Sequence, residues 1–79
     1  MTAINLNGSR RPIAAGQTLT DLVGEVTGQR IGADGHPVDG ARLGVAVARN
    51  AEVVPRRYWS ATVLADGDNV EIINAVQGG

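Results

Sequence analysis

The sequence predicts one α+β domain, in which a single main helix packs across a mixed sheet of four to five strands. Three observations support this prediction. The chain has 79 residues, which is enough for one domain. One segment has a clear helical period, and the other regular segments show the alternation and the turn residues of short strands. One helix in a strand-rich chain is typical of the α+β class.

The N-terminal segment predicts a β-hairpin. Ile4 and Leu6 alternate with polar residues, which is the period of a half-buried strand. Asn7-Gly8 follows, and both residue types tolerate the positive φ angles of a type I′ turn. The returning strand should cover about residues 10–15. Because proline cannot donate a ladder hydrogen bond, Pro12 predicts that this strand lies at the edge of the sheet.

The main helix is predicted to begin after Thr18 and to end at Gly28. Thr18 followed by Asp21 resembles a capping box, with aspartate in place of the usual glutamate or glutamine. Gly28 is a residue type that commonly ends a helix. Between the two ends, apolar residues follow the i, i+3, i+4, i+7 spacing of one helical face, at Leu19, Leu22, Val23 and Val26.

Residues 29–42 are rich in glycine and show no period, so we expect a loop. Asp34, His36 and Asp39 raise the possibility of a metal site. Two carboxylates and one histidine on such a loop lack the rigid ligand set and the supporting contacts that metal sites use. We therefore expect an ordinary solvated loop and no metal.

The second half of the chain predicts another hairpin. Leu43, Val45 and Val47 alternate with small residues, a turn is expected at residues 49–51, and the chain should return through residues 52–54. Pro55 should end or bend the returning strand. A short apolar turn is then expected at Val63 and Leu64.

The last strand is expected to start near Asn69, directly after a tight turn at residues 66–68. Val70 and Ile72 would point to one face of the sheet and Ile73 to the other. Apolar residues on both faces predict a central position in the sheet.

The composition argues against a self-contained enzyme. The chain has no cysteine and one histidine, which leaves almost no candidates for nucleophilic catalysis. It contains no phosphate-binding loop, dinucleotide fingerprint or GxSxG motif. The net charge of −1 argues against a nucleic-acid module. With no signal peptide at its start and no apolar stretch near the roughly 18 residues of a membrane span, the chain is expected to be soluble and cytoplasmic.

The chain ends in "VEIINAVQGG", an apolar strand pattern followed by a short tail with two glycines. Chance and terminal disorder are two ordinary explanations for such an ending. A functional explanation rests on geometry, because residues without a Cβ atom pass where walls are close. The last five residues could span about 17 Å when extended. That length would carry a terminal carboxylate into a partner's active site.

Several of these stretches together resemble a known family. The order of hairpin, helix, hairpin and strand, with the "GG" ending, resembles the ubiquitin-like β-grasp proteins. More narrowly, residues 44–79 resemble the sulfur carriers of thiamine biosynthesis (ThiS type), above all in "VVPRRYW", "LADGD" and "AVQGG". The stretches "INLNG" and "AAGQTLTDLV" fit the same family. The loop at residues 29–42 departs from it, because it is longer than in these small carriers.

The resemblance implies a β-grasp fold for residues 1–79, with a flexible C-terminal tail at residues 75–79. It implies a cosubstrate that is not an enzyme and binds no cofactor itself. A ubiquitin-activating-like adenylyltransferase would use ATP and Mg²⁺ to adenylate Gly79, and a persulfide sulfur donor would convert the adenylate to a thiocarboxylate. A thiazole synthase would then accept the sulfur. Gly79 and Gly78 would form the sulfur-carrying end, and the tail that enters the partner's active site would add Ala75, Val76 and Gln77.

Other functions remain open at this point. The small subunit of molybdopterin synthase has the same fold and the same terminal chemistry. A ubiquitin-like modifier would instead join its terminal carboxyl to target lysines. A β-grasp interaction domain would have no use for the two glycines. The sulfur donor, the activating enzyme, the docking surface and the oligomeric state do not follow from the sequence.

The aromatic residues and the arginines beside them have two interpretations. Trp59 and Tyr58 could contact a partner, since these residue types are common hot spots. For Trp59 we favour a place in the core, because a small core without phenylalanine needs the area that a tryptophan buries. Arg56 and Arg57 could meet an acidic partner, but adjacent charges are usually solvated.

Overall fold

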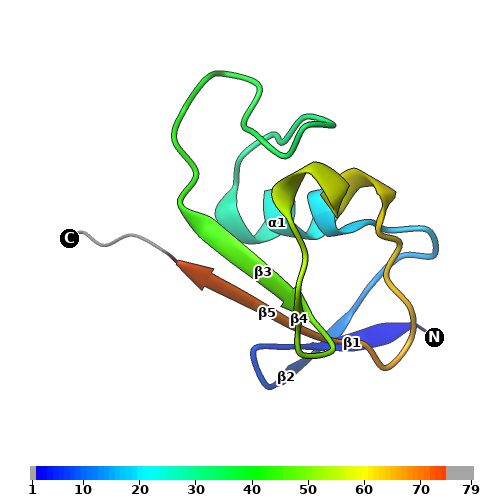
Figure 1. Ribbon diagram of the computed structural model, residues 1–79. Helices are drawn as coiled ribbons and strands as arrows, with labels where there is room; N and C mark the ends of the chain where they lie inside the picture. Colours follow the sequence, from blue (N-terminus) through cyan, green and yellow to red (C-terminus); the bar gives the residue numbers. More distant parts are fainter. Residues whose placement is uncertain (1, 75–79) are drawn as a thin grey trace.

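The computed structural model describes residues 2–74 of the chain. A five-stranded sheet with the strand order β2-β1-β5-β3-β4 forms one layer, and α1 and the short 3₁₀ helix η1 pack together on one face of it (Figure 1). The elements are β1 (Ala3–Leu6), β2 (Ser9–Pro12), α1 (Leu19–Thr27), β3 (Val45–Arg49), β4 (Glu52–Val53), η1 (Arg56–Ala61) and β5 (Asn69–Asn74). This arrangement confirms the α+β prediction and has the β-grasp architecture.

The sheet is mixed, and β5 is its central strand. β1 pairs with β2, and β3 pairs with both β4 and β5, in antiparallel fashion, whereas β1 and β5 are parallel. The two hairpins therefore lie on opposite sides of β5. The predictions that β2 lies at an edge and that β5 lies at the centre are both confirmed. β2 is shorter than expected and ends at Pro12.

The helix begins and ends where its sequence signals predict. The Thr18 side chain accepts a hydrogen bond from the Asp21 N–H, and the Asp21 carboxylate accepts one from the Thr18 N–H. Such a pair satisfies two N–H groups that the helix itself cannot use. Gly28 ends the helix in the left-handed conformation, with φ of 74°. Val26 is the exception on the apolar face: it is 43% exposed, because the last turn of α1 borders a surface groove.

The core lies between α1, η1 and the covered face of the sheet. Its buried members come from these elements and, in the case of Leu64, from the chain between η1 and β5. They are Ile4, Leu19, Leu22, Val23, Val45, Val47, Trp59, Leu64 and Val70. Trp59 is 1% exposed, and its indole N–H donates to the Val54 carbonyl at 3.0 Å. The interpretation of Trp59 as a core residue is confirmed, whereas Tyr58 is half-exposed.

The sequence did not predict η1, and with it the role of Arg56 was missed. The Arg56 guanidinium donates to the carbonyls of Gly35 at 2.9 Å and Leu43 at 2.8 Å, and it lies 4.8 Å from the centre of the Trp59 ring. It also donates to the Val45 carbonyl at 3.3 Å. Our expectation that Arg56 is simply solvated was therefore wrong. This side chain fastens the long loop at residues 29–42 to the sheet and to the core.

The two candidate carboxylate ligands of the loop serve its local turns. Asp34 accepts a hydrogen bond from the backbone N–H of His36 at 3.0 Å, and Asp39 accepts one from the N–H of Ala41 at 2.9 Å. Within residues 2–74, no group of three or more His, Asp or Glu side chains is placed to hold a metal ion. The carboxylates thus have the role in turns that is common for aspartate.

A buried carboxylate joins the β3–β4 turn to the start of β5. Asp68 is 7% exposed and accepts hydrogen bonds from Arg49 Nε at 2.8 Å, from Asn50 Nδ2 at 3.1 Å and from the Ala65 N–H at 2.9 Å. Burial raises the pKa of Asp68, but the Ala65 N–H and the Arg49 and Asn50 side chains outweigh burial, so the pKa lies below the ordinary value of 3.8. The charged form is therefore favoured by folding.

We expect the free energy of unfolding to fall as the pH is lowered through the pKa of Asp68. Because the folded pKa is below 3.8, the stabilisation is complete above that pH and is lost in more acidic solution. At pH 7, Asp68→Asn should cost about 2 kcal/mol, the size of hydrogen bonds to a charged group, and its stability should change less between pH 5 and pH 2. Urea unfolding across this range measures both effects. An Asp68→Asn profile with the wild-type slope would contradict this role, and Asp39→Asn is the exposed control.

Candidate functional site

The residues predicted to carry the function lie outside the described part of the chain. These are Ala75, Val76, Gln77, Gly78 and Gly79. The structure instead describes the base from which they continue, namely the end of β5 and its neighbours. The site is therefore built here from the residues that hold this base.

One side of the end of β5 is held by backbone pairing to β3. The antiparallel register runs from Val70 opposite Arg49 to Asn74 opposite Val45, so the pairing continues to the last described residue. The other side differs, because β1 pairs with β5 only at Asn5–Asn69 and Leu6–Val70. Beyond these two pairs, the side chain of Asn7 makes the hydrogen bonds to β5 that a neighbouring strand would otherwise make.

Asn7 makes two hydrogen bonds to the backbone of Ile72. Its Nδ2 donates to the Ile72 carbonyl at 3.2 Å, and its Oδ1 accepts from the Ile72 N–H at 2.9 Å. The sequence predicted the turn at Asn7-Gly8 but not these contacts. The turn signal is local, whereas the partner lies 65 residues along the chain.

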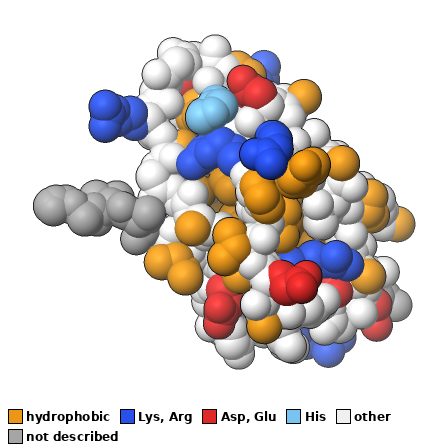
Figure 2. Space-filling view, in the orientation of Figure 1, with side chains coloured by type: hydrophobic (Ala, Val, Ile, Leu, Met, Phe, Trp, Pro, Cys, Tyr) orange, Lys and Arg blue, Asp and Glu red, His pale blue; other side chains and the backbone are white. Residues whose placement is uncertain are grey.

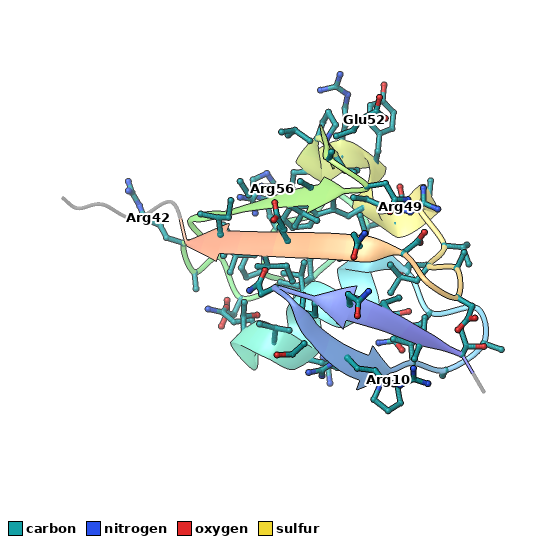
Figure 3. All side chains as sticks on the ribbon, turned by 90° about the horizontal axis from the view of Figure 1, so that it is seen from below. Arg10, Arg42, Arg49, Glu52 and Arg56 are labelled. Carbon is teal, nitrogen blue, oxygen red and sulfur yellow. The ribbon has the colours of Figure 1, made fainter. Side chains whose placement is uncertain are left out.

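A groove of about 520 Å³ lies beside the same end of β5. It is bordered by the last turn of α1, by the chain before β3, and by Asn7 and Ile72. Arg42 also lines it, and Figure 3 shows the Arg42 side chain pointing outward at the end of the molecule where β5 ends. No signal in the sequence connected Arg42 with this place, because it belongs to the loop that departs from the family pattern.

The face of the sheet opposite α1 is not covered by any described element (Figure 3). Ile73 lies opposite Ala46 and Val53 lies opposite Ala48, and these four residues share the open face because Ala46 and Ala48 are two positions apart. Ile73 is 56% exposed and Val53 is 75% exposed. Figure 2 looks at the molecule from the direction of Figure 1 and not onto this open face, and it shows hydrophobic side chains across the middle with the histidine and several basic side chains above them.

The described residues offer binding surfaces and positioning contacts, but they do not bring a base, a nucleophile and an oxyanion-binding group together. Among the described residues, Asp68 is the one buried acid, and both of its carboxylate oxygens already accept hydrogen bonds from Arg49, Asn50 and Ala65. None of the helices in the described part of the chain could span a membrane.

Comparisons with known proteins agree with this picture. A model of the ThiS family matches residues 4–79. The chain is 29% identical over 76 residues to the sulfur carrier protein ThiS of Escherichia coli, which covers 96% of this chain and 97% of that protein. The crystal structure of the thiamine biosynthesis protein ThiS from Geobacter metallireducens superposes with a TM-score of 0.69 at 28% identity, covering 99% of this chain and 100% of that one.

A second curated relative is much longer than this chain. A protein of Paramagnetospirillum magneticum named thiazole synthase is 34% identical over 74 residues. The match covers 94% of this chain but only 19% of the relative, so the chain spans about a fifth of that protein's length.

Proposed function

Because the chain belongs to the ThiS family of sulfur carrier proteins, we propose that the carboxylate of Gly79 is the group that carries the sulfur. The protein is a sulfur carrier of thiamine biosynthesis, and it acts as a cosubstrate and not as a catalyst. The observation that supports Gly79 most is the position of β5. This central strand is paired to β3 up to Asn74 and is bound by Asn7 on its other side as far as Ile72. The family match continues through residue 79.

The proposed chemistry begins with activation, because a carboxylate oxygen is a poor leaving group. A ubiquitin-activating-like adenylyltransferase joins the Gly79 carboxylate to AMP and releases pyrophosphate from ATP, with Mg²⁺ held by the enzyme and the nucleotide. The terminal sulfur of a donor persulfide then attacks the Gly79 carbonyl carbon and displaces AMP. A thiol next cleaves the resulting S–S bond, which leaves the thiocarboxylate on Gly79 and a disulfide on the donor side.

The tail would bring this group to its partners. Extended, residues 75–79 would span about 17 Å, so the folded body can stay outside an active site that the thiocarboxylate enters. Ala75, Val76 and Gln77 would form the part between body and terminus, and Gly78 would keep the chain narrow next to Gly79. In this proposal, residues 1–79 act as one domain with a tail at residues 75–79.

A thiazole synthase is the proposed acceptor of the sulfur. The relative named thiazole synthase contains a segment that is similar to 94% of this chain, which favours this acceptor over the large subunit of molybdopterin synthase. Affinity purification of the chain from its host distinguishes the two. Recovery of a thiazole synthase is expected, and recovery of the molybdopterin synthase subunit alone would contradict the thiazole assignment.

The proposal is tested by alkylation and mass measurement. The chain is incubated with ATP, Mg²⁺, an activating enzyme and a persulfide donor, treated with iodoacetamide and digested. Because the chain has no cysteine, we expect a single stable adduct, and it should lie on the C-terminal peptide. Omission of ATP is the control and should abolish the adduct. An unmodified C-terminus in the complete reaction would contradict the proposal, and a Gly79 isopeptide bond in host extracts would favour the modifier function.

A further inference from the structure

Among the described residues, the part of β5 after Val70 has no strand partner on the β1 side. β1 turns away at Asn7 and Gly8, where φ is 51° and 87°, and leaves β5 after the Leu6–Val70 pair. On its other side β5 remains paired to β3 up to Asn74. The backbone groups of Ile72 on the β1 side would therefore face solvent if no side chain reached them.

The carboxamide of Asn7 supplies both missing partners. Ile72 needs an acceptor for its N–H and a donor for its carbonyl, and an amide side chain offers one of each. The distances are 2.9 Å and 3.2 Å, and the backbone N–H of Asn7 also donates to the Val70 carbonyl at 2.9 Å. One residue thus makes three hydrogen bonds to β5 and continues the parallel pairing without another strand residue.

The geometry points to Asn7 as a positioning residue that sets the direction in which the tail leaves the body. This inference rests on the proposed function of Gly79. Ile72 lies three residues before Ala75, where the proposed tail begins. With Ile72 bound by Asn7 on one side and the strand paired to β3 on the other, the end of β5 has few orientations. Less conformational freedom is therefore lost when the tail enters a partner's active site. Pairing to β3 alone would leave this end free to twist away from the sheet.

Asparagine is the residue type that meets all the demands of this position. A φ of 51° lies in the left-handed region, where glycine, asparagine and aspartate are the residues usually found. Glycine would keep the turn but has no side chain. Aspartate would keep the acceptor for the Ile72 N–H, but its second oxygen would face the Ile72 carbonyl oxygen, so that contact would become repulsive. The turn and the contacts with Ile72 therefore select the same residue.

The test compares Asn7→Gly and Asn7→Asp with the wild-type chain in adenylation by the activating enzyme. Both variants keep a residue that tolerates the turn, so they should fold, and circular dichroism checks this. Amide exchange at Ile72, followed by NMR, should be roughly fivefold faster in Asn7→Gly, the factor expected for one lost hydrogen bond. At saturating carrier concentration, kcat should fall several-fold while KM stays within about twofold, because docking of the body is unchanged. The Asn7→Asp variant should have an amide exchange rate at Ile72 and a kcat between those of the wild-type chain and Asn7→Gly.

A matched control separates positioning from stability. Asn5 donates to the Asn69 side chain at 3.2 Å, so Asn5→Ala also removes a side-chain hydrogen bond between β1 and β5, but at the end far from the tail. Asn5→Ala should keep the wild-type kcat. The inference is overturned if Asn7→Gly keeps the wild-type kcat despite faster exchange at Ile72, or if Asn5→Ala lowers kcat as much. In both cases the proposed function stands, whereas a wild-type chain that is never adenylated would overturn that function itself.

Discussion

Deletion of Gly79 is expected to abolish loading of the chain with sulfur while the folded body stays intact. The change moves the terminal carboxylate back by one residue, about 3.5 Å along an extended chain. Since a displacement of 1 Å can cost about 100-fold in rate, adenylation should fall at least 100-fold. Pyrophosphate release and the mass of the C-terminal peptide after alkylation measure the loss.

The control for this deletion keeps the length of the tail. Gln77→Ala removes a side chain but leaves the carboxylate at its original distance from β5, so its adenylation rate should stay within about tenfold of wild type. Both variants should unfold at the wild-type urea concentration, because neither change touches the described core. If the shortened chain accepted sulfur at the wild-type rate, the terminal glycine would not be the carrier position.

The elements with local signals could be predicted from the sequence. The capping box of Thr18 and Asp21 begins the helix and Gly28 ends it, and each of these signals depends on residues a few positions apart. The turn at Asn7-Gly8 similarly depends on two adjacent residues that tolerate positive φ angles. Pro12 predicted that β2 lies at the edge of the sheet, and apolar residues on both faces of β5 predicted that β5 lies at its centre. These predictions were confirmed because the distant contacts in the fold agree with the local preferences, as the contacts of Asn7 with β5 do.

The contacts that depend on distant residues could not be predicted. Arg56 looked like one of two solvated charges, but its acceptors are Gly35 and Leu43, which lie 21 and 13 residues away. Asn7 looked like a turn residue only, because its partner Ile72 is brought near by the parallel pairing of β1 and β5. The candidate site was predicted as a tail, whereas the structure adds the residues that hold the base of that tail.

Gly35 occupies a place where no side chain fits. It is buried, its φ is 85°, and an added Cβ atom would overlap Cγ of Arg56 and lie 2.6 Å from the Arg56 carbonyl oxygen. The Gly35 carbonyl also accepts a hydrogen bond from the Arg56 guanidinium at 2.9 Å. Because Arg56 simultaneously binds Leu43 and lies over Trp59, it cannot withdraw from Gly35 without giving up contacts with the core.

Gly35→Ala is therefore expected to lower the free energy of unfolding by about 3 kcal/mol, from overpacking together with the strain of a positive φ angle. That is a large part of the roughly 5–15 kcal/mol that holds a small domain together. Gly40→Ala is the matched control, because Gly40 is in the same loop and has a φ of 81°, but nothing lies within 4 Å of its added Cβ atom. It should cost about 1 kcal/mol. Urea unfolding of both variants measures the difference, and equal losses would mean that Arg56 does not hold the loop against the core.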